Sequence, residues 1–251
     1  MLREHLFNKT LTTDPDFRWR GGEVSRLEAF SDGIFAITIT LLIVATAGVE
    51  RFYDVWLLVR DLPAFLASFA LIMYVWFEHH QFFRRYGLND GLTLLTNGLL
   101  MFLVMILAYP LKLLTTFLWH LALGEPTLPL FELPADATIA ISLFQQRIYM
   151  MYFYGAAIIG VFGCILLLHL NAWRQKHALE LDALERFITL QSIAHQVVTV
   201  LIAGLSLIIL FFTKRPDFAG IVYFLMPLIH IPLGIFLGSQ RSKSNTKSNG
   251  S

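Results

Sequence analysis

Polar residues stand at the edges of the long apolar stretches of this sequence, in positions where they could do chemistry. Ser31 and Asp32 open the first stretch, Trp76 and His79 close the second, and Asn97 lies inside the third. A carboxylate, an imidazole and an amide at one depth in a membrane can relay protons or ions. They can also hydrogen-bond one another and hold three helices together, and both interpretations stay open at this point.

Enzyme chemistry has few candidates in this chain. His79 and His80 are adjacent, so on a helix they point about 100° apart. Three further histidines each stand alone in an apolar stretch: His169, His195 and His230. No HExxH or GxSxG run occurs, and the single Cys164 excludes a disulfide within the chain and a cysteine-rich metal site. The sequence therefore predicts no catalytic residue, no metal site and no cofactor.

The elements that position the polar residues can be predicted from the distribution of charge. Only 15% of the 251 residues are charged, against about 25% in soluble domains. A bilayer core of about 30 Å needs roughly 20 apolar helical residues. Six charge-free stretches approach this length: Gly33–Val49, Leu62–Phe77, Gly91–Leu111, Ile148–Trp173, Phe187–Thr213 and Phe218–Gln240. Their continuous apolar character predicts helices rather than a barrel, and hence an all-α membrane protein.

The first two stretches are short, and each can extend into its flank. The first extends back to Phe30. The second extends back to Trp56, or else Pro63 marks a new helix that follows a short interfacial helix. We expect an N-terminal segment 1–25, a six-helix domain 26–240 and a disordered tail 241–251.

The basic residues predict the orientation in the membrane. Those of the N-terminal segment, of the second-to-third and fourth-to-fifth connections, and of the tail fall on one side. By the positive-inside rule both termini are cytoplasmic, in a multi-pass protein of the plasma membrane. Lys214 and Arg215 break the pattern before the last span. The net charge of +1 gives no reason to expect nucleic acid as a partner.

The start of the first span resembles a known family. Arg26, Phe30, Ser31 and Asp32 fit the R-x-x-x-F-S-D signature on the first helix of the transmembrane protein 175 family of potassium-permeable channels. Landmarks of that family's second and third helices are similar to Trp76, His79, Asn97 and the Tyr109–Pro110 step. The motifs cover roughly residues 24–115, and the rest of the chain matches only by the number of spans.

The resemblance implies a potassium-permeable, weakly selective cation channel whose first helices line a central pore. Prokaryotic members carry one six-span repeat per chain, which implies a homotetramer here. The partners would be other copies of the chain, the lipid bilayer and permeant monovalent cations, K⁺ above all. In that family the signature residues chiefly hold the first helix to its neighbours, a role that would fall to Arg26, Phe30, Ser31, Asp32, Trp76, His79 and Asn97.

The periodicity of the first helix is compatible with a pore face. At 100° per residue, Ile37, Thr40, Leu41 and Val44 share one stripe, whereas Ser31 and Asp32 point away from it. A stripe of this kind alone is more often a helix–helix or lipid contact. Thr38 points sideways with Ser31 and is assigned to packing, although a rotation by one position would exchange Thr38 for Thr40.

The resemblance gives two residues of this stripe a role. The constricting isoleucine of the family corresponds to Ile37, and the threonine implicated in ion preference corresponds to Thr40. A ring of isoleucine side chains closes a path by dewetting, while a ring of hydroxyls offers neutral oxygens to a partly hydrated cation. The sequence has no TVGYG run, so a carbonyl-lined potassium filter is not expected.

A proton-coupled secondary transporter is the alternative function. It would use Asp32 and His79 as titrating groups. Such carriers usually show internal symmetry and broken helices near the midplane, and the prolines of this chain form no matched pair in two halves.

Overall fold

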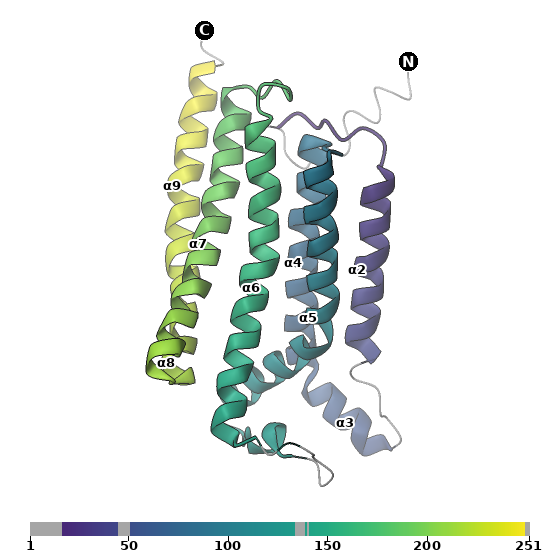
Figure 1. Ribbon diagram of the computed structural model, residues 1–251, viewed down its shortest axis with the longest axis vertical. Coiled ribbons are helices and arrows are strands. Elements are labelled where there is room, and N and C mark those ends of the chain that lie inside the picture. Colours follow the sequence, from purple (N-terminus) through teal and green to yellow (C-terminus); the bar gives the residue numbers. More distant parts are fainter. Residues whose placement is uncertain (1–16, 45–50, 134–138, 140, 249–251) are drawn as a thin grey trace.

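The computed structural model in Figure 1 is a bundle of helices in the residues that it describes, which are 17–44, 51–133, 139 and 141–248. Its elements in chain order are α2 (Arg26–Val44), α3 (Phe52–Arg60), α4 (Leu62–Tyr86), α5 (Gly91–Leu123), η1 (Leu128–Phe131), α6 (Leu143–Arg174), α7 (Ala183–Thr213), α8 (Pro216–Ile221), η2 (Val222–Phe224) and α9 (Leu225–Ser248). Six segments of this part of the chain are long and apolar enough to cross a membrane. The prediction of an all-α, six-span membrane protein is confirmed.

The second span differs from its predicted length. Helix α4 continues to Tyr86, nine residues beyond the predicted end at Phe77. A search for charge-free windows stops at Glu78, but a charged side chain near the end of a span is tolerated when it finds a partner or reaches the interface. Arg84, for example, pairs with Glu28 of α2 at 3.2 Å.

The chain between the first two long helices forms a separate short helix. Helix α3 ends at Arg60, and Pro63 lies in the first turn of α4. Of the two alternatives left open by the sequence, a separate short helix followed by a new helix is therefore correct. Its aromatic residues Phe52, Tyr53 and Trp56 are 60–82% exposed, which suits a helix lying at a membrane surface.

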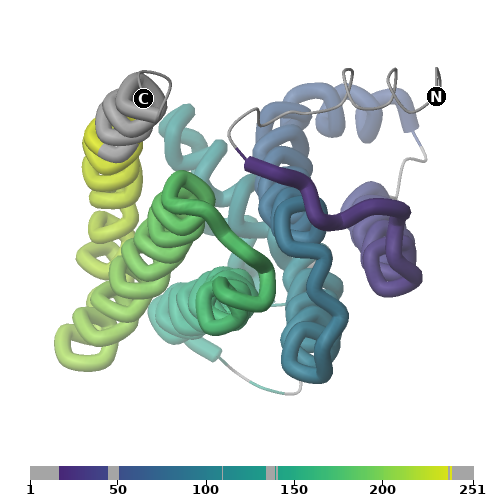
Figure 2. Tube along the Cα trace, turned by 90° about the horizontal axis from the view of Figure 1, so that it is seen from above, coloured from purple at the N-terminus to yellow at the C-terminus, as the bar shows by residue number. Residues whose placement is uncertain are grey.

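Helix α2 lies at one edge of the bundle and α9 lies at the opposite edge (Figures 1 and 2). Helix α2 packs against α5 and α4, while α6 packs between α5 and α7, and α7 contacts α9. Buried side chains of α2, α4, α5 and α6 form one continuous apolar core that includes Phe35, Phe82, Leu100, Ile165 and Leu168.

The start of α2, the end of α4 and the start of α7 lie at one end of the bundle, which is called the terminal end below (Figure 1). The described part of the N-terminal segment, residues 17–25, crosses this end before α2 begins (Figure 2). Arg20 there binds Glu185 at the start of α7, with an N–O distance of 2.5 Å. The Gly21 N–H donates to the Arg84 carbonyl at 3.1 Å. A Cβ at Gly21 would lie 2.6 Å from the Phe83 carbonyl oxygen, so this close approach requires glycine.

Helices α5 and α6 are joined at the terminal end through Asp90. Its carboxylate accepts hydrogen bonds from the Thr93 hydroxyl at 2.6 Å and from the Asn171 amide at 3.0 Å. Burial by itself raises the pKa of Asp90, but these hydrogen bonds outweigh it and lower the pKa below its usual value.

The end of the chain is more helical than its composition suggests. Helix α9 continues to Ser248, so the segment 241–248, predicted to be disordered, is helical, and 249–251 lie outside the described residues. Adding polar residues to an existing helix avoids the cost of nucleation, which explains the extension.

Candidate pore-lining helix and its supporting network

Helix α2 presents one fully packed face. Ser31, Phe35, Thr38 and Leu42 recur at helical spacing and are at most 1% exposed. They face α5 and α4, the helices against which α2 packs. The Thr38 hydroxyl donates to the Ile34 carbonyl of its own helix at 2.8 Å. Thr38 is therefore held in the interior of the bundle.

The opposite face of α2 is uncovered in the single chain. Ile37 is 53% exposed and Val44 is 56% exposed. Thr40 is also exposed, with its hydroxyl bonded to the Ala36 carbonyl at 3.0 Å, and Leu41 is half-buried. The stripe identified in the sequence thus lies on the side of α2 that no other described helix covers. Of the two threonines, Thr38 is packed and Thr40 is exposed.

Asn97 of α5 joins α2 and α4 by side-chain hydrogen bonds. Its amide nitrogen donates to the Ser31 hydroxyl at 2.9 Å, and its amide oxygen lies 2.8 Å from His79 Nε2. Because an amide oxygen only accepts, Nε2 of His79 carries the proton in this arrangement. The Ser31 hydroxyl in turn donates to the Leu27 carbonyl at 2.9 Å. All three polar side chains are at most 1% exposed.

A second set of side-chain contacts joins α2 to α4. The Trp76 indole N–H donates to the Asp32 carboxylate at 2.9 Å. The Trp76 ring stacks on His80, with ring centroids 5.2 Å apart. His80 also lies 3.8 Å from the buried Glu28 carboxylate. The five polar residues singled out at the span edges are thus brought together in two groups, Ser31–Asn97–His79 and Asp32–Trp76.

Arg26 and Phe30 do not take part in this network, contrary to the sequence-based expectation for the whole signature. Arg26 is exposed and Phe30 is 64% exposed. They precede Ile37 by eleven and seven residues, which places both within about 20° of it around the helix. The same arithmetic that defined the stripe predicts this position. Arg26 and Phe30 therefore extend the exposed face of α2 to the terminal end.

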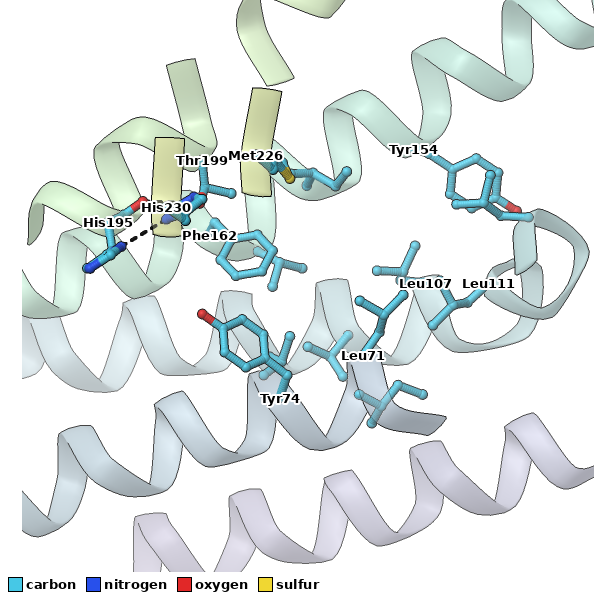
Figure 3. A pocket seen from close by; sticks show the side chains of 16 residues that line it. Leu71, Tyr74, Leu107, Leu111, Tyr154, Phe162, His195, Thr199, Met226 and His230 are labelled. Atoms are coloured by element: carbon cyan, nitrogen blue, oxygen red, sulfur yellow. Dashed lines mark hydrogen bonds between the residues drawn. The ribbon is translucent and has the colours of Figure 1, made fainter. Parts of the chain in front are cut away.

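Two histidines that stand alone in the sequence are paired in space. His195 of α7 and His230 of α9 lie with their Nδ1 atoms 2.8 Å apart, and Thr199 reaches His230 Nε2 at 3.1 Å. They line a cavity of about 470 Å³ (Figure 3). The sequence holds no signal for this pairing, since the periodicity of a helix does not reveal its neighbour. Within the described residues, no group of three or more His, Cys, Asp or Glu could hold a metal ion.

Comparison with known proteins supports a family assignment. The profile of the family described as "Endosomal/lysosomal potassium channel TMEM175" matches residues 26–108, which carry α2, α4 and the first half of α5. A protein named "Potassium channel" from Marivirga tractuosa is 32% identical over 247 residues, covering 96% of this chain and 97% of the relative. The chain belongs to the TMEM175 family.

Further relatives agree with this membership. A protein of Chamaesiphon minutus, also named a potassium channel, is 40% identical over 109 residues, covering 39% of this chain and 52% of its own length. A crystal structure of a variant of the potassium channel MtTMEM175, bound to a nanobody–MBP fusion protein, superposes with a TM-score of 0.74. It shares 32% identity and covers 92% of this chain and 98% of its own. The matched relatives are bacterial, which agrees with the prokaryotic type of TMEM175 predicted from the single repeat.

Proposed function

We propose that this chain is a potassium-permeable, weakly selective cation channel in which four copies surround a pore lined by α2. The observation that carries the proposal is the division of α2 into a packed face, which includes Ser31 and Thr38, and an uncovered face that is mainly apolar. The potassium-channel names of the relatives support it. Membership of a channel family also argues against an enzyme.

The apolar stripe gives the pore a gate. Four Ile37 side chains around one axis exclude water from a narrow passage, and an ion cannot pass until the ring widens. The Thr40 hydroxyls, about one turn away, offer neutral oxygens to a partly hydrated K⁺. Oxygens without full charge discriminate weakly between K⁺ and Na⁺, and no cofactor is needed for passive flow.

The polar network fixes the rotation of α2. Ser31 and Asp32 are bound from α5 and α4, so a turn of α2 about its axis would break the contacts with Asn97 and Trp76. In this role Asp32 and His79 are hydrogen-bonded positioning residues. Both side chains hold α2 to its neighbours, and this favours the channel over the proton-coupled transporter.

The basic residues support a cytoplasmic location for the terminal end. Arg18, Arg20, Arg84, Arg85 and Arg186 lie there, and positive charge is retained on the cytoplasmic side of bacterial plasma membranes. Both termini are then cytoplasmic, and α3 lies at the outer surface.

Potassium flux into proteoliposomes tests the pore face. Ile37→Asn should wet the constriction and raise the flux severalfold, while Thr40→Ala should mainly change the ratio of K⁺ to Na⁺ flux. Ile43→Asn is the matched control, because Ile43 is equally exposed, at 52%, but lies about 120° away from Ile37 around the helix. The pore face is wrong if the control acts like Ile37→Asn, or if both stripe variants conduct like the unmodified chain while assembled.

A further inference from the structure

Two adjoining cavities lie between α4 and the second half of the bundle. The larger one, of about 470 Å³, is lined mainly by aliphatic and aromatic side chains of α4, α5 and α6. The smaller one, of about 270 Å³, is lined by polar side chains of α4 and α7, including Glu78, Gln191 and Gln196. Tyr74 and His195 line both cavities, so the two adjoin and are treated below as one space with an apolar and a polar part. Its total size is within the range of small-molecule sites.

The lining of this space changes from polar to apolar along the direction of the helices. The polar part lies toward the terminal end, near the last turns of α4 and the first turns of α7. In the larger cavity, His195 and His230 lie at one end and Tyr154 lies at the other (Figure 3). At 1.5 Å per residue, Arg85 and Leu71 are about 21 Å apart along α4, which is more than the roughly 15 Å of one leaflet's hydrocarbon and less than the roughly 30 Å of the whole bilayer core. The space therefore runs along the helices and is long enough for an extended acyl chain whose head group lies at the terminal end.

The polar part contains one buried hydrogen-bond acceptor without a partner, next to a carboxylate. The Glu78 carboxylate accepts hydrogen bonds from the Gln196 amide, at 3.0 Å, and from the Tyr74 hydroxyl. The side-chain oxygen of Gln191 is buried and has no hydrogen-bond partner among the described residues. A buried acceptor without a partner costs about 1–3 kcal/mol. A bound group with O–H or N–H donors would remove this cost.

The charges around the polar part cancel. Glu78 and Arg85 are two turns apart on the same face of α4 and attract each other. A carboxylate head group would be repelled by Glu78, and an ammonium head group would be repelled by Arg85. A hydroxyl both donates and accepts, so it satisfies Gln191 and Glu78 without adding charge.

We propose that this space binds a single-chain lipid with an uncharged, hydroxyl-bearing head group, of the monoacylglycerol type. The head group lies in the polar part against Gln191 and Glu78, and the acyl chain lies in the larger cavity. Leu71 and Tyr74 are 48% and 47% exposed, which gives the lipid a way in from the bilayer. The proposal concerns binding alone and does not rest on conduction.

Four probes with the same acyl chain separate the head-group chemistries. Delipidated protein in detergent is titrated with monoolein, methyl oleate, oleate or oleylamine, and the bound molecules are counted by native mass spectrometry. Monoolein should bind at least about tenfold more tightly than methyl oleate, which has no donor. Equal binding of these two would reduce the space to an unselective apolar cavity. Tighter binding of oleate or oleylamine would overturn the neutral head group.

Two variants place the bound lipid. Gln191→Leu should weaken monoolein binding about tenfold and leave methyl oleate unaffected, whereas Leu107→Trp should fill the larger cavity and abolish binding of both. The controls are Asn89→Leu, at an exposed position outside the cavities, and Leu201→Trp on the 64% exposed surface of α7. Normal binding by both cavity variants would overturn the site. The comparison of probes on the unmodified chain decides the matter even if a variant fails to fold.

Discussion

At the scale of single residues, Asn97 has the largest structural task. Replacing it by leucine leaves the Ser31 hydroxyl and His79 Nε2 without their inter-helix partners in a fully buried place. Stranded buried polar groups cost about 1–3 kcal/mol, and hydrogen bonds inside membranes fall toward the low end of such values. We therefore expect Asn97→Leu to lower the free energy of unfolding by about 1–3 kcal/mol, measured by thermal unfolding in detergent.

The matched control for this experiment is Asn89→Leu, which makes the same change at an exposed position. It should leave the unfolding temperature nearly unchanged. If Asn97→Leu is as stable as the control, the network does not hold α2 in place, and another contact must fix the rotation of that helix.

The residues of this network could be found from the sequence because each is polar in an apolar environment. Each of the five residues is polar at a position where its span is otherwise apolar: Ser31, Asp32, Trp76, His79 and Asn97. The alternating directions of the spans predicted that they lie at a similar depth. The sequence did not show which of these residues bind one another. The two-group arrangement depends on side-chain reach and on the distances between helix axes, which the sequence does not encode in any local pattern.

At the scale of elements, α2 has two faces with different environments, and cysteine substitution can separate them. In a Cys164→Ala background, cysteines at Ile37, Leu41 and Val44 should react with a water-soluble thiol reagent and block flux. Cysteines at Phe35, Thr38 and Leu42 should stay unreactive, because these positions are at most 1% exposed. Cys164 itself is buried, so its removal is a conservative starting point. Reaction of the cysteines on the packed face would contradict the assignment of the two faces. So would a conducting protein in which the cysteines of the stripe do not react.

The elements themselves were largely predictable, since a span is a property of local composition. The six spans and the short helix before Pro63 followed from apolar length and from the rigidity of proline. The sequence did not predict the end of α4 or the helical structure of residues 241–248. Glu78 and the polar residues after Gln240 are tolerated in helices because of contacts and helix continuation that a window of hydropathy ignores. The pairing of His195 with His230 was missed for the same reason, since it joins separate helices.

At the scale of the whole molecule, the uncovered face of α2 leaves two possibilities. In a bilayer an apolar face can contact lipid, or it can contact another copy of the chain. The exposure of this face in one chain therefore does not determine the assembly. The position of α2 at the edge of the bundle allows several copies to meet along it (Figure 2). The family membership favours four copies around one axis.

Mass and cross-linking together test this assembly. In mild detergent the protein should have a mass of four chains of 28.6 kDa after subtraction of bound detergent and lipid. In the Cys164→Ala background, Ile37→Cys should form disulfide-linked chains on oxidation, because residues at a narrow axis approach within the 7 Å between Cα atoms that a disulfide tolerates. Leu201→Cys, on α7 at the far side of the bundle from α2, is the control and should stay uncross-linked. A monomeric mass would remove the four-fold pore, whereas a tetramer that cross-links through Leu201 and not through Ile37 would place a different helix at the axis.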